Sequence, residues 1–303
     1  MKVLLRMRHG LGDNSQFTIV MRHIRHYFPN WKVDMEVGEG KDSYFKQFAN
    51  KIFRRKVDLY DSRDYDNLLN IDWPTPEECS SDLPSSKPTR FLQCYLQVKP
   101  IEDLYRGYDV TITPEENQLV NEYVNKLPNK PFVIVHYLAK TLKHAKSLTH
   151  TDAAFICKQI MDMDCTPVIL DWKKESPLPD QETIFNPGVD DPIWEGRRWS
   201  SAGTIAALIS RAKLYIGVDS GPLHVAGCTK TPSLGIWHGH HPVNFFDLCD
   251  NVTHLVPDGK LKSIKGTKKN DGRNYFEKSY NHVYYQNLGQ ALSEQIVSRL
   301  GKE

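Results

Sequence analysis

Hydrophobic positions in the N-terminal part of the chain change their spacing from one segment to the next. Residues 3–5 form a short apolar run, which predicts a buried strand. Beyond a glycine turn at 10–12, apolar residues recur at the spacing of one helix face: Phe17, Val20, Met21, Ile24 and Phe28. Residues 33–37 alternate apolar and charged side chains, as half-buried strands do. The chain therefore opens as an α/β domain.

The segment up to residue 131 is less regular. A second amphipathic helix is predicted from the spacing of Phe45, Phe48, Ala49 and Ile52. Residues 72–99 are rich in Pro, Ser, Asp and Glu and predict loops and short helices. A further helix is expected over 114–127, with Pro114 in its first turn. Pro128-Asn129-Lys130-Pro131 then interrupts the chain, and we place the junction between two domains there.

Strand and helix patterns alternate again in the second half of the chain. The continuous apolar run at 132–136 is typical of a buried parallel strand. Further strands are expected at 167–170, 214–218 and 233–237. Helices are expected up to about Met163, around 205–212, from Pro222 and in the last segment, 288–300. This order predicts an α/β protein of two facing, doubly wound halves.

Composition narrows the class of protein. The 303 residues suit about two domains, and the 40% hydrophobic and 25% charged residues are ordinary for a globular chain. No apolar run approaches the about 20 residues of a membrane helix, and no signal-peptide core follows the start, so we expect a cytoplasmic protein without a membrane span. The net charge of +2 argues against a protein that mainly coats nucleic acid. The six cysteines are far apart and are expected to be separate thiols.

The segment 217–227 carries the clearest chemical signal. Asp219, Ser220 and Gly221 form a turn between a buried strand and a helix that has Pro222 in its first turn. The unpaired backbone N–H groups and the dipole of such a helix start suit a phosphate. Asp219 would lie at the carboxyl end of its strand, where open α/β sheets bind ligands. The alternative is that Asp219 and Ser220 only cap the helix.

Three segments together form a set of motifs. Asp219-Ser220-Gly221-Pro222-Leu223-His224 is followed by Ala226-Gly227 and Thr231-Pro232-Ser233, Gly10-Leu11-Gly12-Asp13-Asn14 follows the first strand, and a Lys-containing loop runs from His136 to Lys146. The first segment resembles the D-S-G-P-x-H…T-P signature of glycosyltransferase family 9, the heptosyltransferases of lipopolysaccharide synthesis and their relatives. The second resembles that family's G-x-G-D turn, and the third its lysine loop. The Trp-Pro pair that usually follows this loop is absent here.

The resemblance implies a GT-B fold, in which two Rossmann-like domains face each other across a cleft. Residues 1–128 would form the acceptor-side domain, residues 129–285 the nucleotide-sugar-binding domain and residues 286–303 a C-terminal helix. The implied reaction is an inverting, metal-independent transfer of a sugar such as heptose from a nucleotide diphosphate sugar to a hydroxyl of a glycan or lipopolysaccharide-type acceptor. An ADP-sugar is the implied donor, and the reaction would need no other cofactor.

Roles for individual residues follow from the resemblance and from their positions. Asp13 is expected to be the general base, the alternative being an N-cap of the helix that follows. Asp219 would accept hydrogen bonds from the donor sugar. Contacts with the rest of the substrates are expected from Gly12, Asn14, Lys140, Thr141, Lys143, Asp171, Ser220, Gly221, Pro222, His224 and His238. Trp172 would accompany Asp171 at the base or ribose. At His238, His240 and His241 we expect contacts with the donor sugar or the acceptor rather than a metal, and for Asp162 and Asp164 we expect surface positions.

Three alternatives stay open at this stage. The same fold could glycosylate a modified DNA base or a protein side chain, with the basic segments 51–56 and 260–278 as phosphate contacts. A non-catalytic relative that binds a nucleotide sugar or a glycan is a second alternative. The third is a Rossmann oxidoreductase, which is disfavoured because Ser15 stands where G-x-G-x-x-G needs its third glycine.

Overall fold

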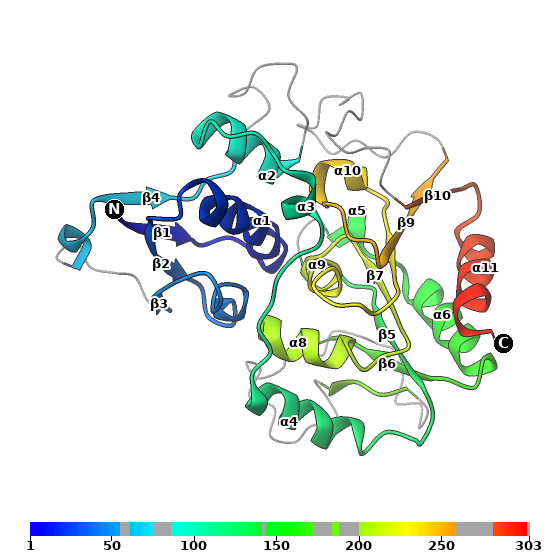
Figure 1. Cartoon of the computed structure of the whole chain (residues 1–303). Helices are drawn as coiled ribbons and strands as arrows, with labels where there is room; N and C mark the ends of the chain where they lie inside the picture. Colours follow the sequence, from blue (N-terminus) through cyan, green and yellow to red (C-terminus); the bar gives the residue numbers. More distant parts are fainter. Residues whose placement is uncertain are drawn as a thin grey trace.

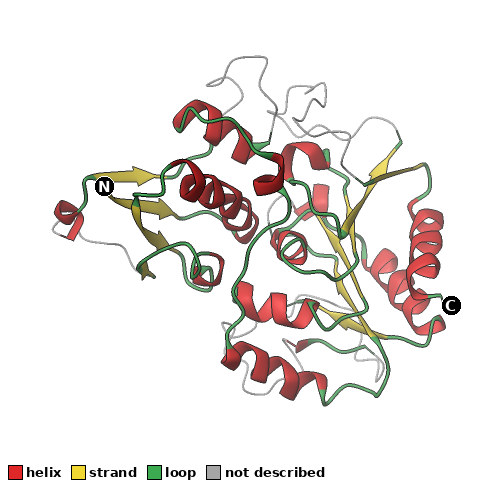
Figure 2. Ribbon diagram, in the orientation of Figure 1, coloured by secondary structure: helices red, strands yellow, loops and turns green. Residues whose placement is uncertain are grey.

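The structure is a computed structural model that describes residues 1–54, 61–74, 86–140, 143–171, 184–187, 200–258 and 281–301. Within these residues the chain forms two parallel sheets, one of four strands and one of six. The smaller sheet lies on the left of Figure 1, with the N-terminus, and the larger sheet lies on the right, with the C-terminus. We call them the first and the second sheet, and the parts of the chain built on them the first and the second unit. Figure 2 shows helices around both sheets.

The first sheet has the strand order β3-β2-β1-β4, and all neighbours are parallel. Its strands are β1 (Lys2–Met7), β2 (Lys32–Val37), β3 (Ile52–Phe53) and β4 (Asn67–Asn70). The long helix α1 (Leu11–Tyr27) covers one face with the apolar stripe that the sequence predicts, of which Phe17, Val20, Met21 and Ile24 are buried. Short helices complete the unit: η1 (Asp42–Tyr44), η2 (Asp61–Asp64), α2 (Lys87–Arg90), η3 (Phe91–Tyr95) and α3 (Glu102–Tyr105).

The other face of the first sheet carries polar and charged side chains around the buried Leu4. Because side chains alternate along a strand, Arg6 and Glu36 lie opposite the apolar face, and they pair at 2.9 Å. Arg8 contacts the same carboxylate. Asp34 accepts a hydrogen bond from the Tyr65 hydroxyl at 2.7 Å. In the described part of the chain, these pairs stand where a doubly wound domain would place a second layer of helices.

The second sheet has the order β10-β9-β8-β7-β5-β6, again all parallel. Its strands are β5 (Phe132–His136), β6 (Thr166–Ile169), β7 (Leu214–Val218), β8 (Ser233–Ile236), β9 (Val252–Pro257) and β10 (His282–Tyr285). Helices α6 (His150–Asp162) and α11 (Leu288–Leu300) pack on one face, and α8 (Ala202–Ile209) and α9 (Gly221–Ala226) on the other. The doubly wound arrangement is confirmed for this sheet.

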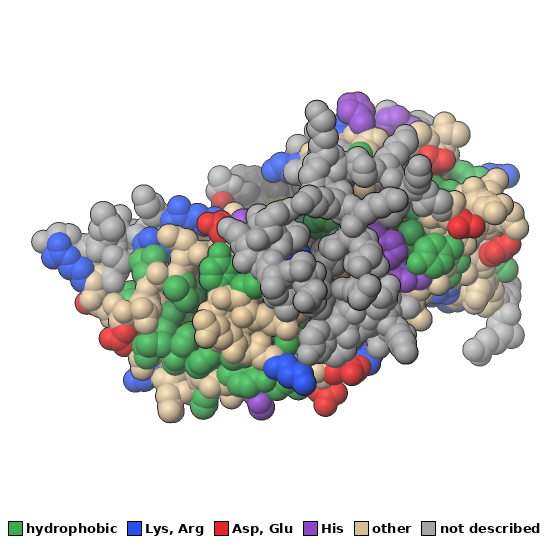
Figure 3. Space-filling view, turned by 90° about the horizontal axis from the view of Figure 1, so that it is seen from above, with side chains coloured by type: hydrophobic (Ala, Val, Ile, Leu, Met, Phe, Trp, Pro, Cys, Tyr) green, Lys and Arg blue, Asp and Glu red, His purple; other side chains and the backbone are tan. Residues whose placement is uncertain are grey.

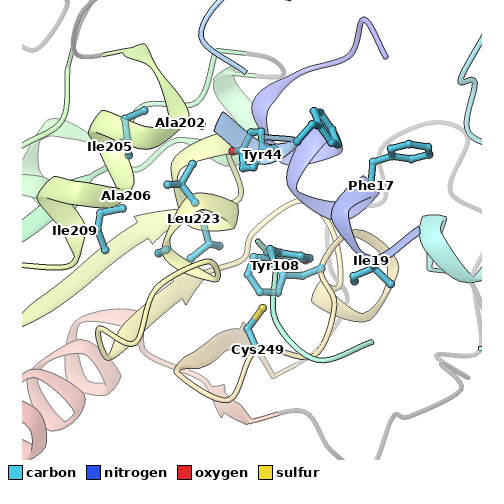
Figure 4. Close-up of a cluster of buried hydrophobic side chains, with 14 of the residues drawn as sticks. Phe17, Ile19, Tyr44, Tyr108, Ala202, Ile205, Ala206, Ile209, Leu223 and Cys249 are labelled. Atoms are coloured by element: carbon cyan, nitrogen blue, oxygen red, sulfur yellow. The ribbon is translucent and has the colours of Figure 1, made fainter. Parts of the chain in front are cut away.

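The hydrophobic core is continuous between the two units. Helix α1 packs against α9, and one cluster of buried residues runs from β1 to the inner face of the second sheet. Figure 4 shows part of this cluster, with Phe17 and Ile19 on α1, Leu223 on α9, and Tyr108 and Cys249 between them. Helix α4 (Pro114–Val124), which the sequence-based boundary assigns to the first domain, packs against α8. The two units are therefore held together by apolar packing.

Two predicted features of the first unit are wrong. Residues 45–52 form turns followed by strand β3, because the backbone of Asn50 and Lys51 is already hydrogen-bonded to β2, at 2.8 Å to Val33 and 2.9 Å to Met35. Pairing with a neighbouring strand here replaces the helix. Helix α1 begins at Leu11 with Gly10 as its N-cap, so neither Asp13 nor Asn14 caps it. Strands β3, β4, β9 and β10 and helices α3 and α5 (Lys143–Lys146) are not among the predicted elements.

The described cysteines differ in their bonding state. Cys94 is disulfide-bonded, so the expectation of six separate thiols is wrong for this residue, because distant cysteines can meet in the fold. Cys157, Cys165, Cys228 and Cys249 are free. No helix in the described part of the chain is long and apolar enough to cross a membrane.

Candidate active site

Three adjacent strands of the second sheet, β8, β7 and β5, each lead to one charged or polar side chain at their carboxyl ends. Asp219 follows β7 directly, Lys146 ends helix α5 in the loop after β5, and His240 follows β8. One oxygen of Asp219, Oδ2, accepts hydrogen bonds from Lys146 Nζ and from His240 Nδ1, both at 2.8 Å. The carboxyl ends of parallel strands meet at one edge, which explains how residues so far apart in the sequence form one cluster.

The charge state of this cluster is well defined. Burial raises the pKa of Asp219, but the His240 hydrogen bond and the Lys146 charge outweigh it, and the pKa lies at about 2. An ionised carboxylate can only accept hydrogen bonds, so Nδ1 of His240 carries the proton. The His240 ring lies 4.1 Å from the Phe245 ring, centre to centre, which fixes its orientation. In the described residues Nε2 of His240 has no hydrogen-bond partner, and it is the atom that this cluster presents to a ligand.

The first sheet forms a similar cluster around Asp13. Asp13 lies in the first turn of α1, after β1, and its carboxylate pairs with Lys87, the first residue of α2. Lys41, after β2, donates to the His9 carbonyl at 2.5 Å and lies close enough to Asp13 for their charges to interact. Burial raises the pKa of Asp13, but the charge and hydrogen bond of Lys87, with smaller contributions from His9 and His224, outweigh burial, so the pKa lies below its ordinary value of 3.8. The carboxylate is therefore ionised at neutral pH.

His224 lies between the two clusters. Burial lowers the pKa of His224 to about 4, although the nearby carboxylates of Asp219 and Asp13 raise it, so the ring is neutral at pH 7. The ring is buried and its Nδ1 has no hydrogen-bond partner in the described part of the chain. A Cβ atom on Gly12 would come within 2.7 Å of the His224 ring, so only glycine fits at this position. The N-terminal turn of α1 thus brings Asp13 close to α9.

Gly221 makes the same close approach possible from the other side. A Cβ atom there would lie 2.8 Å from Cβ of Leu11 in α1. The sequence analysis places this glycine in the turn that is expected to bind a phosphate. The structure adds a packing role, because a side chain here would prevent the contact between α1 and α9. Pro222, next in the chain, is buried in the first turn of α9.

The capping alternatives for the two aspartates do not hold. Ser220 occupies the N-cap position of α9, but its side chain makes no capping hydrogen bond, and the Asp219 carboxylate is engaged with Lys146 and His240. Asn14 is fully buried, and its amide donates to the carbonyls of His9 at 3.0 Å and Gly10 at 2.8 Å. It secures the turn after β1, and its predicted contact with substrate stays a prediction.

The remaining predicted residues lie around these clusters. Lys140 is exposed and close enough to Lys41 for their charges to interact, and Lys143 is exposed at the start of α5. Asp171 is buried just after β6, and His238 is half-buried after β8. Thr141 and Trp172 lie outside the described residues, as does the basic segment 260–278. The structure thus joins Gly12, Asp13, Asp219 and His224 and selects Lys146 and His240 as the partners of Asp219.

Three lysines of the site are missing from the predicted set: Lys41, Lys87 and Lys146. Lys146 and His240 lie in segments that the sequence marks as informative, and the choice among neighbouring lysines and histidines needs the fold. Lys41 and Lys87 have no motif. In the part of the chain that is described, no three His, Cys, Asp or Glu side chains are placed to share a metal ion. Asp164 is exposed and pairs with Lys130 at 2.7 Å, which confirms its predicted surface position.

A cavity of about 720 Å³ opens at the edge of the first sheet. Its lining comprises Asp42, Lys46, Ala49, Asn50, Ile52, Phe53 and Arg54. Arg54 pairs with Asp42 at 2.7 Å and keeps 65% of its side chain exposed. The cavity thus offers amide, carboxylate and cationic groups beside apolar surface, which suits a polar ligand such as a glycan. The space-filling view from above shows Lys and Arg side chains on both units and most of the visible histidine side chains on the right, over the second unit (Figure 3).

Known proteins resemble this chain in part of its sequence and in its whole fold. The model of glycosyltransferase family 9 (heptosyltransferase) matches residues 202–275. No curated protein sequence matches the chain. The structure of E. coli ADP-heptose lps heptosyltransferase II superposes with a TM-score of 0.69 at 13% identity, covering 99% of this chain and 98% of that one. A family 9 glycosyl transferase from Veillonella parvula DSM 2008 gives 0.64 at 12% identity, covering 100% and 90%.

A third solved structure, E. coli heptosyltransferase WaaC with ADP, gives a TM-score of 0.55 at 10% identity, covering 84% of this chain and 92% of that one. At such identities the likeness concerns the fold, and it confirms the predicted GT-B architecture. The match over residues 202–275 confirms the resemblance to family 9 and, with this fold, indicates a glycosyltransferase.

Proposed function

We propose that this protein, which has the fold of family 9 glycosyltransferases and matches their sequence model over residues 202–275, transfers a sugar from a nucleotide diphosphate sugar to an acceptor hydroxyl. One observation carries the proposal. Two ionised aspartates, Asp13 and Asp219, follow strands of two different sheets and lie on either side of His224. Such a site can activate one substrate from the first unit and hold the other on the second unit.

The donor diphosphate would bind among the lysines of both units. Lys41 and Lys87 belong to the first unit and Lys140 and Lys146 to the second. The pKa values of Asp13 and His224 depend on Lys87, that of Asp219 on Lys146 and that of Lys41 on Lys140, so the four ammonium groups surround one region. Cations of this kind stabilise the charge of a leaving diphosphate. This supports a transfer that needs no metal ion.

Asp13 is the proposed general base. Its side chain is 23% exposed, whereas that of Asp219 is 5% exposed. Only the first can reach an acceptor hydroxyl without a rearrangement of the site. The proton would move to Asp13 while the hydroxyl oxygen bonds to the anomeric carbon from the face opposite the diphosphate. This geometry is that of an inverting transfer.

Asp219 and His240 would bind the donor sugar. Nδ1 of His240 donates to Asp219, so Nε2 of the neutral ring would accept a hydrogen bond from a sugar hydroxyl. Oδ1 of Asp219 is a second acceptor, since both contacts of this carboxylate use Oδ2. Two acceptors side by side recognise a pair of hydroxyl groups, and the solved relatives named above include an ADP-heptose transferase. Heptose is therefore the first donor sugar to test, with ADP as its nucleotide.

The acceptor is proposed to be a glycan of lipopolysaccharide type, bound by the first unit. The cavity lined by Asn50 and Arg54 provides groups for it. The similarity to E. coli ADP-heptose lps heptosyltransferase II supports this class of acceptor. DNA and protein acceptors, the non-catalytic alternative and the cytoplasmic location stay predictions.

Thermal unfolding with ADP-, UDP-, GDP- and CDP-sugars tests the donor site. A ligand at about 100 times its Kd adds about 2.7 kcal/mol of stability, which is a shift of several degrees in Tm. We expect a shift with one nucleotide without Mg²⁺ and its loss in Asp219→Asn. Asp164→Asn is the matched control, because this exposed aspartate pairs with Lys130. Stabilisation by none of the donors would contradict the proposed function.

A further inference from the structure

Lys87 is the cation that contacts Asp13, and aromatic rings hold it from two sides. Its ammonium group pairs with Oδ1 of Asp13. It lies 5.9 Å from the ring centre of Trp73 and 5.9 Å from that of Phe245. Trp73 belongs to the first unit and Phe245 to helix α10 (Pro242–Phe245) of the second. Only 22% of the Lys87 side chain is exposed, so the pair has a defined geometry rather than the mobility of a surface ion pair.

The residue before Lys87 is fixed by the second unit. Ser86 is fully buried, and its hydroxyl donates to Oδ1 of Asp247 at 2.8 Å. Asp247 lies just after α10 and is itself fully buried. It also accepts from the Tyr105 hydroxyl at 2.7 Å and from Gln16 at 3.1 Å. All these donors come from the first unit, so this carboxylate holds the start of α2 in place across the two units.

The hydroxyl of Tyr108 completes the network. It donates to Oδ2 of Asp247 at 3.1 Å and accepts from the Asp247 backbone N–H at 2.7 Å. A buried carboxylate with four donors is satisfied without a positive charge. Burial nevertheless raises the pKa of Asp247. The network therefore depends on the donors of the first unit staying in place.

We propose that Lys87 is a positioning residue for Asp13. The hydrogen bond between Ser86 and Asp247 of the second unit holds the start of α2, and thereby Lys87, against the Asp13 carboxylate. This inference rests on the proposed function, in which Asp13 is the general base. Lys87 donates to Oδ1, so Oδ2 of Asp13 stays available for the acceptor proton. Asp13 is oriented as a base only while the two units are packed against each other as they are in this structure.

The transfer step shows what Lys87 contributes. The acceptor O–H bond breaks, its proton moves to Oδ2 of Asp13, and the oxygen forms a bond to the anomeric carbon. The bond from that carbon to the diphosphate oxygen breaks, and the nucleoside diphosphate leaves with the electron pair. Lys87 neither gains nor loses a proton in this step. It keeps the Asp13 carboxylate ionised and orients it so that Oδ2 faces the acceptor hydroxyl.

Four titratable groups bear on Asp13: Lys87 from α2, His9 after β1, His224 from α9 and Lys41 after β2. His9 and His224 also lower the pKa of Asp13, but less than Lys87 does. Removal of the Lys87 charge leaves burial as the main influence, so the pKa of Asp13 rises. A base with a raised pKa is protonated, and inactive, up to a higher pH.

The test is the pH profile of kcat/KM for the acceptor at saturating donor. Lys87→Met keeps the length and the apolar stem of the side chain and removes the charge. We expect the acidic limb of the Lys87→Met profile at a higher pH than that of the wild-type protein. At a pH below this limb, the activity of the variant should be about tenfold lower for each pH unit by which the limb has shifted. Lys87→Arg should restore the limb. Lys130→Met, which removes the lysine of an exposed Lys–Asp pair, is the matched control and should leave the profile unchanged.

Ser86→Ala tests the anchor with a smaller change than a substitution of Asp247. It removes one of four donors to the carboxylate and should move the acidic limb in the same direction as Lys87→Met, but less. Three results would overturn the inference: a profile that does not move in Lys87→Met, a rise in the donor KM alone, or no rescue by arginine. The second of these would leave Lys87 with the proposed diphosphate contact alone and no role in positioning Asp13. Failure of the proposed function is distinguishable, because the wild-type protein would then transfer no sugar and no donor would raise its Tm. If only the base role of Asp13 fails, Asp13→Asn should retain full transfer.

Discussion

The two sheets each place an aspartate after a strand that has a neighbour on both sides, yet the two carboxylates differ. Asp219 follows β7, its side chain is 5% exposed, and Lys146 and His240 both bind its Oδ2. Asp13 follows β1, its side chain is 23% exposed, and only Lys87 pairs with it in the described part of the chain. The flanking strands supply cations in both sheets.

The difference shows that the same topology can place one carboxylate almost fully buried between two partners and another where solvent reaches it. Asp219 has a pKa of about 2 and is held by two partners, so it suits a fixed contact with a bound ligand. Asp13 is ionised but reachable, which is what a base for an acceptor hydroxyl needs. Exposure, rather than residue type, separates the two proposed roles.

The largest effect is expected for Asp13→Asn. An amide cannot take the acceptor proton, so kcat should fall by about 10²–10⁴-fold, the usual contribution of a general base. Donor affinity should change little, because the base acts mainly in the transition state. Steady-state transfer assays and donor titration measure the two quantities. Full activity in this variant would remove the distinction between the two aspartates.

Asp219→Asn should affect stability and donor binding more than the chemical step. Removing one partner of a buried ion pair leaves Lys146 without its counter-charge, which costs about 3–5 kcal/mol. Thermal unfolding and donor titration should both report this loss. A variant that is as stable as the wild-type protein would contradict a stabilising role of the buried Asp219–Lys146 ion pair.

The same residue gives the wild-type protein an acid dependence with a definite sign. The folded pKa of about 2 lies below the ordinary value of 3.8, so the folded state favours the ionised form. This part of the stability is complete above the ordinary value and is lost as the pH falls towards 2. The acid-induced unfolding curve of Asp219→Asn should lack this contribution.

The second sheet could largely be predicted from the sequence, because its central strands are buried on both faces. The apolar runs 132–136 and 214–218 coincide with β5 and β7. β10 at the edge of this sheet (His282–Tyr285) and the two-residue β3 at the edge of the first carry weak patterns. Their pairing depends on neighbours that no local spacing shows. The helix predicted at 45–52 fails for the same reason.

The site divides in a similar way. Asp13, Asp219 and His224 belong to motifs with turn glycines and could be predicted to lie near each other. Lys87 has no such signal, since it reaches Asp13 across 74 positions of the sequence through tertiary packing. The choice of Lys146 and His240 over Lys143 and His238 depends on side-chain direction at the strand ends. Motifs therefore predict the carboxylates, and the fold selects their partners.

Gly12→Ala should disturb the contact that brings the two aspartates together. The new Cβ would lie 2.7 Å from the His224 ring, so α1 or α9 must shift. We expect a loss of about 1–3 kcal/mol, as for other overpacked cores, and lower transfer activity. Gly289→Ala is the control, because a Cβ there meets its nearest atom at 3.4 Å in a helix, where alanine is favoured. Equal Tm changes in both variants would contradict the close approach.

The smallest effect is expected at His240, and it sharpens the comparison. His240→Ala removes a partner of Asp219 and the proposed contact with the donor sugar, so donor affinity should fall by about tenfold, as for one hydrogen bond to a charged or bound group. His240→Asn retains an N–H donor for Asp219 but lacks the ring nitrogen Nε2. If the ring acts only on Asp219, asparagine should restore donor affinity. If Nε2 binds the sugar, asparagine should restore thermal stability while donor affinity stays low, and this second result is the one that we expect.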